Sequence, residues 1–172
     1  MEPIPYGKQD INNEDIKAVV DVLKSDFITQ GPKVEEFESE FAKYIGSKYA
    51  IAVSNGTAAL HLSALAMGVK KGTKIITTPL SFVATSNCIE YCGGEVEFCD
   101  INPDTLCLDI DLVRKKLKNA PKGTYSGIIP VDFAGYPVNM EEFRDLANEY
   151  NLWILEDSCH APGGYYTDSK NQ

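Results

Sequence analysis

Three segments of the chain place small, aromatic or charged side chains directly after apolar runs, where they could do chemistry. The first is SNGTAA (54–59), which leaves an apolar run and opens a helix with small residues. The free N–H groups of a first helical turn, the helix dipole and the Thr57 hydroxyl would together bind an anion such as phosphate. An ordinary strand-to-helix turn, capped by Asn55 or Thr57, is the alternative. The segment matches neither a GxGxxG nor a P-loop pattern.

The second segment, TTPLSFVAT (77–85), places Phe82 at the start of a predicted helix, above the end of a predicted strand. An aromatic ring there could stack on a flat heteroaromatic ligand, and such stacking contributes about 0.5–1.5 kcal/mol beyond the burial of area. A core phenylalanine in the first helical turn is the alternative interpretation.

The third segment, LWILEDSCHA (152–161), ends a buried strand with two carboxylates and a histidine. A carboxylate buried there must be paired or hydrogen-bonded, because burial of an isolated charge is costly. Asp157 facing a pyridinium nitrogen would be paired in this way and would keep that nitrogen protonated, so that the ring stays a good electron sink. A helix-capping aspartate, a metal ligand and a structural histidine are the alternatives.

Hydrophobic periodicity predicts the elements that must position these segments. Two amphipathic helices come first, over NNEDIKAVVDVLKS (12–25) and over 34–45. Apolar strands separated by helices follow: YAIAV (49–53), KIITT (74–78), EVEFC (95–99), GIIPV (127–131) and LWILE (152–156). The expected helices between them open near Asn55, span 81–91 and 109–119, and begin at Asn139. Strands that are apolar on both faces predict an α/β fold with a mainly parallel sheet, in a three-layer α/β/α arrangement.

Composition narrows the class of protein. The formal net charge of −9 argues against a protein that binds nucleic acid through its phosphate backbone. The N-terminus does not read as a secretory signal, and the apolar runs are too short for a membrane span. The five cysteines lack paired CxxC spacing, and with only two histidines a metal site is not expected. We therefore expect reduced thiols in a cytoplasmic protein that binds neither nucleic acid nor a membrane.

In chain order, SNGTAAL, TTPLSFVATSN, PVDFAGYPV and EDSCHA resemble the DegT/DnrJ/StrS sugar aminotransferases, a branch of the fold-type-I enzymes that use pyridoxal 5'-phosphate (PLP). The opening PYGKQDINNEDI and the stretch FITQGPKVEEFE are similar to the same family, so the resemblance covers essentially the whole chain. It implies the PLP-dependent transferase fold type I. Residues 1–48 would form an N-terminal helical segment with a substrate loop, and 49–172 an incomplete PLP-binding large domain.

The resemblance also implies roles for single residues. Gly56, Thr57 and Ala58 would hold the PLP phosphate. Phe82 would stack on the pyridine ring, Asp157 would pair with the ring nitrogen, and His160 would lie near the phenolic oxygen. The substrate pocket would include the following residues: Tyr6, Asp26, Phe27, Ile28, Thr29 and Gly56.

Within the family, SFVATSN, VDFAG and DSCHAPGG are most similar to the branch that acts in pseudaminic acid biosynthesis. This similarity implies amination at C4 of a UDP-linked 4-keto-6-deoxy-N-acetylhexosamine, with glutamate as the amino donor, in a homodimer.

The lysine that forms the Schiff base lies, in this family, in an SFHxxK-like segment. The resemblance places that segment beyond Gln172, so we expect no catalytic residue in this chain. Lys170 follows the polar stretch TDS and is not expected to replace it. We therefore expect a truncated protein that is inactive alone. Two alternatives stay open: a PLP-dependent sugar dehydratase, in which a histidine replaces the lysine, and a non-catalytic module that binds PLP or a nucleotide sugar.

Overall fold

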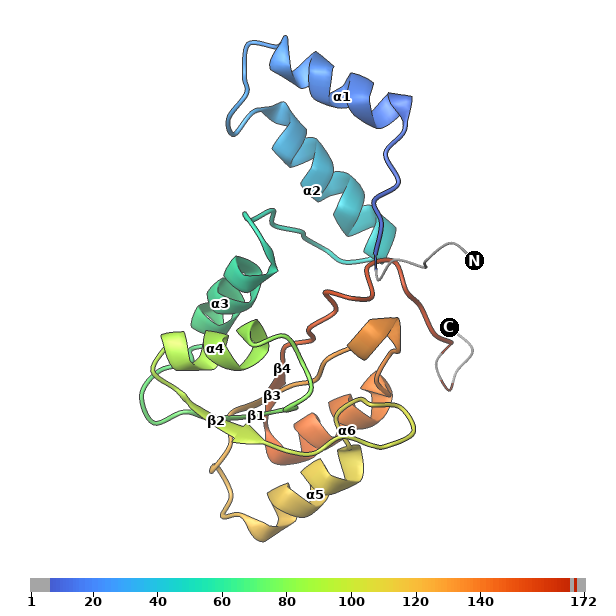
Figure 1. The fold of residues 1–172 in the computed structure, drawn as a ribbon. Helices are drawn as coiled ribbons and strands as arrows, with labels where there is room; N and C mark the ends of the chain where they lie inside the picture. The colour runs from blue at the N-terminus through green and yellow to red at the C-terminus, as the bar shows by residue number, and fades with distance from the viewer. Residues whose placement is uncertain (1–6, 168, 170–172) are drawn as a thin grey trace. The chain divides into compact units, whose positions relative to one another are not determined.

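The computed structural model describes residues 7–167 and 169, which form two compact units that divide between Ala52 and Val53 (Figure 1). Each unit has its own secondary structure, and each is described here by itself. Within the described part of the chain, no helix combines the length and the apolar character that crossing a membrane requires.

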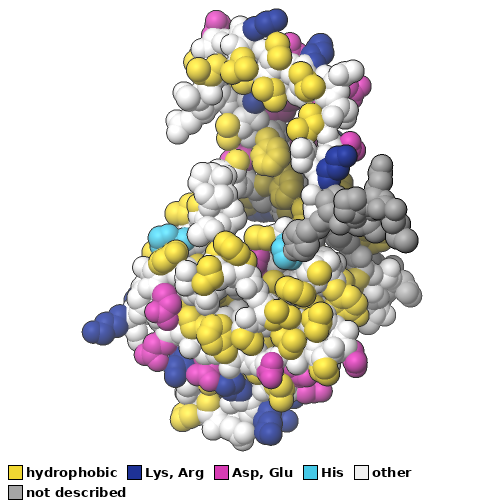
Figure 2. Space-filling model, viewed as in Figure 1, with side chains coloured by type: hydrophobic (Ala, Val, Ile, Leu, Met, Phe, Trp, Pro, Cys, Tyr) yellow, Lys and Arg dark blue, Asp and Glu magenta, His cyan; other side chains and the backbone are white. Residues whose placement is uncertain are grey.

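The first unit contains two amphipathic helices, as the periodicity predicts. Helix α1 (Asn13–Leu23) begins at Asn12, whose side chain accepts hydrogen bonds from the backbone N–H groups of Glu14 and Asp15. Helix α2 (Pro32–Ile45) ends at Gly46, which has the left-handed φ of +70° that favours glycine. No residue of α1 is buried, and hydrophobic side chains gather along these helices in Figure 2.

The segment YAIAV (49–53) is not a strand, and this prediction was wrong. Ile51 is 81% exposed, and the N–H of Ala52 donates to the carboxylate of Glu38 at 2.7 Å rather than to another strand. An extended apolar segment becomes a strand only when a neighbour supplies the hydrogen-bonding ladder. Among the described residues, no strand lies beside this segment.

The second unit is built on a parallel sheet in the order β2-β1-β3-β4 (Figure 1). Its strands are β1 (Lys74–Thr77), β2 (Glu95–Phe98), β3 (Gly127–Ile129) and β4 (Trp153–Ile154). Gly127 lies against the indole of Trp153 on β4, and a Cβ there would come within 2.3 Å of a ring atom. Glycine is therefore required at that pairing position.

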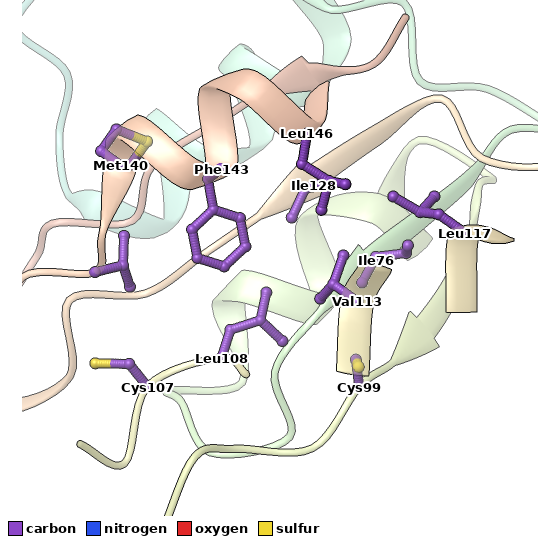
Figure 3. Packing of buried hydrophobic residues seen from close by; sticks show 11 residues of the cluster. Ile76, Cys99, Cys107, Leu108, Val113, Leu117, Ile128, Met140, Phe143 and Leu146 are labelled. Carbon is purple, nitrogen blue, oxygen red and sulfur yellow. The ribbon is translucent and has the colours of Figure 1, made fainter. Parts of the chain in front are cut away.

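Helices cover both faces of this sheet, in the predicted three layers. Helices α3 (Gly56–Ala66) and α4 (Ala84–Tyr91) lie on one face, and α5 (Ile110–Asn119) and α6 (Met140–Tyr150) on the other (Figure 1). Successive side chains of each strand point to opposite faces of the sheet, so each strand contributes to two hydrophobic cores, one on each face. Ile75 and Ile129 pack with α3 and α4, whereas Ile76 and Ile128 pack with α5 and α6. Figure 3 shows the second core, in which Phe143 of α6 lies among side chains of the sheet and of α5.

Two element boundaries differ from the sequence prediction in ways that affect the site. Helix α4 begins at Ala84 rather than at 81, which leaves Ser81 and Phe82 in the loop after β1. Strand β4 is short, but its pairing continues along the chain. The N–H of Asp157 donates to the carbonyl of Pro130 at 2.9 Å, and Val131 and Asp157 form a parallel bridge.

Candidate cofactor site

A cavity of about 250 Å³ lies at the carboxyl ends of β1, β3 and β4, where ligands bind in open α/β sheets. It brings together all three segments that the sequence singles out. The lining residues are Gly56, Thr57, Leu60, Ser81, Phe82, Ala84, Val131, Phe133, Asp157, Cys159 and His160. Two larger cavities, of about 530 and 550 Å³, lie elsewhere in this unit. No residue of the three segments lines the first, and only Leu152 and Trp153, at the start of the third segment, line the second.

Asp157 is the buried charge of the cavity, with 5% of its surface exposed. One carboxylate oxygen accepts a hydrogen bond of 2.6 Å from the hydroxyl of Thr85, and the other accepts a 3.3 Å bond from the N–H of Cys159. The ion pairs of the described residues all lie elsewhere, so no basic side chain neutralises this carboxylate. A buried carboxylate with donors but no counter-charge suits a cationic ligand group, because burial of an unpaired charge is costly.

Phe82 is on the cavity wall and not in the core. It is 70% exposed, which excludes the interpretation as a core phenylalanine. An exposed aromatic ring beside a buried carboxylate suits a flat, positively charged heteroaromatic ligand.

The N-terminus of α3 opens into the same cavity at Gly56 and Thr57. Asn55 caps this helix, and its side chain accepts the N–H of Ala58 at 2.8 Å. The Ala58 N–H is thus occupied, and Ala58 does not line the cavity. Within the described part of the chain, the N–H groups of Gly56 and Thr57 have no hydrogen-bond acceptor. These two groups, with the Thr57 hydroxyl, are the donors that an anion would meet.

His160 lines the cavity, and one of its ring nitrogens already accepts a hydrogen bond. Its Nδ1 accepts a 3.2 Å hydrogen bond from the N–H of Ala134, a residue held at a left-handed φ of +54°. The neutral imidazole therefore carries its proton on Nε2, which leaves an N–H donor for a ligand oxygen.

Two buried side chains that the sequence did not single out form hydrogen bonds with the loop after β4, which carries Asp157. Asp132 is buried, and its carboxylate accepts from the N–H of Val138 at 3.0 Å and from the hydroxyl of Ser158 at 2.8 Å. Thr85, also buried, bonds Asp157 directly. One feature of the sequence could have indicated both residues: each is polar and directly follows an apolar stretch, Asp132 after GIIPV and Thr85 after SFVA.

The charge of Asp157 affects the thiols around it. Partial desolvation at the cavity wall, together with the carboxylate of Asp157, raises the pKa of Cys159 to about 11, although the residue itself is exposed. Burial, with smaller effects of Cys92 and Asp157, raises the pKa of Cys88 to about 11 as well. Glu156, the other carboxylate of the third segment, is exposed and does not line the cavity; desolvation and the nearby Asp132 raise its pKa. The thiols of Cys88 and Cys159 are therefore protonated near pH 7.

The expected substrate residues fall largely in the first unit. Asp26, Phe27, Ile28 and Thr29 form the loop between α1 and α2, and the large side chains of Phe27 and Ile28 are exposed. Tyr6 lies outside the described residues, as does Lys170. Gly56, the expected substrate residue of the second unit, lines the cavity. The roles of these residues stay predictions.

Comparison with known proteins identifies the family. The model of the DegT/DnrJ/EryC1/StrS aminotransferase family matches residues 9–171. The chain belongs to this family. It is 40% identical over 167 residues to an uncharacterized protein, MJ1066, of Methanocaldococcus jannaschii, covering 97% of this chain and 42% of that protein. It is 39% identical to the UDP-4-amino-4,6-dideoxy-N-acetyl-beta-L-altrosamine transaminase of Campylobacter jejuni, covering 97% of this chain and 44% of the transaminase.

Solved structures of this aminotransferase family have the same fold. PseC of Helicobacter pylori, an aminotransferase involved in the biosynthesis of pseudoaminic acid, superposes with a TM-score of 0.86 at 31% identity, covering 97% of this chain and 44% of PseC. The sugar aminotransferase Spr1654 of Streptococcus pneumoniae, solved in a PLP form, gives a TM-score of 0.83 at 28% identity over 92% of this chain and 43% of its own. The chain therefore spans less than half the length of these relatives. The α/β fold of the PLP aminotransferases is confirmed, and PLP is the cofactor that the family supports.

Proposed function

We propose that this chain forms the cofactor cradle of a PLP-dependent aminotransferase that acts on a UDP-linked 4-keto-6-deoxy-N-acetylhexosamine, with glutamate as the amino donor. The observation that carries the proposal is the buried carboxylate of Asp157, which faces a cavity and lacks a counter-charge among the described residues. The protonated ring nitrogen of PLP carries the positive charge that this carboxylate lacks.

The residues of the cavity fit the parts of PLP. Asp157 would hold the proton on the ring nitrogen, and Phe82 would bind the ring by stacking. The free N–H groups of Gly56 and Thr57 would bind the phosphate at the positive end of α3, whereas the N–H of Ala58 is taken by Asn55. The Nε2–H of His160 would donate to the phenolic oxygen. When bound, PLP supplies an electron-withdrawing ring that carries an amino group from donor to acceptor.

The substrate follows from similarity rather than from the cavity itself. The C. jejuni and H. pylori relatives named above act on, or in the biosynthesis of, amino sugars of this kind. We extend that substrate class to this chain, with Tyr6 and the loop 26–29 as sugar-binding residues and with a homodimer as the active assembly. These assignments go beyond the described cavity.

The described residues do not complete an active site. None of the side chains that line the cavity in the described part is a lysine, and PLP chemistry of this class requires an amine at the cofactor. We therefore place that lysine outside the described residues and propose that residues 7–169 bind the cofactor without turning over substrate.

An amination assay tests the proposed function. The protein is incubated with PLP, glutamate labelled with ¹⁵N in its amino group, and the UDP-4-keto-6-deoxy sugar, and the nucleotide sugar is analysed by mass spectrometry. We expect the label to reach the sugar when the chain is extended by a segment that carries the Schiff-base lysine. With this chain alone we expect no transfer. Loss of water from the sugar without transfer of label would instead identify a dehydratase.

A further inference from the structure

We propose that Thr85 is the positioning residue for Asp157: its hydroxyl holds the negative charge on that carboxylate, so that the ring nitrogen of the cofactor keeps its proton. This inference rests on the proposed cofactor and adds a residue that does not touch the cofactor itself, since Thr85 does not line the cavity.

The contact is short and shielded from water. Thr85 has 1% of its surface exposed, and its Oγ1 lies 2.6 Å from the Oδ2 of Asp157. An ionised carboxylate has no proton to share, so the threonine must be the donor. Hydrogen bonds to an ionised acceptor are shorter and about twice as strong as neutral ones, and this distance lies in their range.

The other neighbours of the hydroxyl support the same direction. The carbonyl of Phe82 also accepts from Oγ1, but at 3.0 Å it is a more distant and uncharged acceptor, whereas the carboxylate lies at 2.6 Å. Ser81 places its Oγ 2.6 Å from the same hydroxyl. With the threonine proton directed to Asp157, Ser81 donates to Thr85. A donor chain therefore runs from Ser81 on the cavity wall, through buried Thr85, to the carboxylate.

Such a chain stabilises the charged form of its acceptor. Each donor polarises the next, which strengthens the last hydrogen bond. A carboxylate that accepts a strong hydrogen bond prefers to remain ionised, and a proton shared with a pyridine nitrogen then stays on the nitrogen. Without the hydroxyl, the proton moves toward Asp157 and the ring becomes a weaker electron sink.

The same residue also fixes the loop that carries Phe82. Its backbone N–H bonds the Phe82 carbonyl, and its side chain bonds both Ser81 and Asp157. Thr85 thereby connects the loop after β1, which supplies the aromatic ring, to the loop after β4, which supplies the carboxylate. Both parts of the predicted ring site share one anchor.

The test is Thr85→Val, which keeps the shape of the side chain and removes the hydroxyl. The probe is pyridoxamine 5'-phosphate with ¹⁵N in its ring, which has the ring of PLP but no aldehyde to react with surface lysines. Binding is measured by equilibrium dialysis, and the ring-nitrogen chemical shift reports whether that nitrogen is protonated. We expect affinity to fall by less than tenfold, because the bond between Thr85 and Asp157 is made with and without the probe and only the part that strengthens on binding is lost. The ¹⁵N shift should move toward that of unprotonated pyridine.

Two variants separate this role from a purely structural one. Thr85→Ser restores the hydroxyl and should restore the shift. Thr77→Val removes an equally buried hydroxyl, which bonds the carbonyl of Ile129 at 2.7 Å, and should lower stability without changing the ring nitrogen. If Thr85→Val does not fold, Ser81→Ala is used instead, because it removes the first donor of the hydrogen-bond chain that ends at Asp157. The ¹⁵N chemical shift should then move in the same direction by a smaller amount.

The outcomes distinguish this inference from the proposed function. If the wild-type protein does not bind the probe, the proposed cofactor is wrong and the inference falls with it. If the wild-type protein binds the probe with a protonated ring nitrogen, and Thr85→Val or its Ser81→Ala substitute leaves that nitrogen unchanged, the inference alone is wrong.

Discussion

At the residue scale, the Cys159 thiol reports the charge of Asp157 without any ligand. The residue is exposed, but partial desolvation at the cavity wall and the neighbouring carboxylate disfavour the thiolate and raise its pKa to about 11, from 9.0 for an ordinary thiol. At pH 8 the reactive thiolate then amounts to roughly 0.1%, against about 10% for an unperturbed cysteine. We predict that iodoacetamide alkylates Cys159 about 100-fold more slowly than a model thiol at pH 8, and that the rate rises as the pH approaches 11.

Peptide mapping by mass spectrometry resolves Cys159 from Cys88 and gives the rate for each. Asp157→Asn is the matched variant: it removes the negative charge but keeps the side-chain size, so it should speed the alkylation of Cys159. Alkylation of wild-type Cys159 at the rate of a model thiol would contradict the arrangement of these two side chains.

At the element scale, helix caps should affect stability and cofactor binding separately. Asp109 caps α5, and its Oδ1 accepts from the N–H groups of Asp111 and Leu112 at 2.8 and 3.0 Å. Because α5 covers the face of the sheet opposite α3 and α4, we predict that Asp109→Ala lowers the free energy of unfolding by about 1 kcal/mol. Affinity for pyridoxamine phosphate should not change. Urea denaturation and dialysis measure the two quantities, and Asp109→Asn, which keeps the cap, is the control.

Element types and the ends of strands could be predicted from the sequence, but pairing could not. Alternating apolar strands and helices predicted the three layers, and the position of three segments at the carboxyl ends of strands predicted that Gly56, Phe82, Asp157 and His160 would lie near one another. YAIAV has the composition of a strand but no ladder partner among the described residues, and composition does not reveal a missing partner. Likewise, the Thr85–Asp157 contact joins residues 72 positions apart, so local pattern gives no sign of it.

At the scale of the whole molecule, exposed apolar side chains predict association. Ile16, Val19 and Leu23 of α1 are each more than half exposed, and β2 lies at an edge of the described sheet with Phe98 half exposed. Unpaired edges and apolar faces favour contact with another chain. We predict that the purified 172-residue chain self-associates or aggregates in light scattering coupled to gel filtration. A monodisperse monomer with a cooperative thermal transition would contradict this.

We propose that the cavity at the ends of β1, β3 and β4 holds a pyridoxal-type cofactor through Asp157. Equilibrium dialysis of the wild-type chain and of Asp157→Asn with pyridoxamine 5'-phosphate tests it most directly, because this form of the cofactor cannot attach to lysines. We predict saturable binding of one molecule per wild-type chain and a loss of affinity of about tenfold or more in the variant. Absence of saturable binding, or equal affinity in the two proteins, would contradict the account.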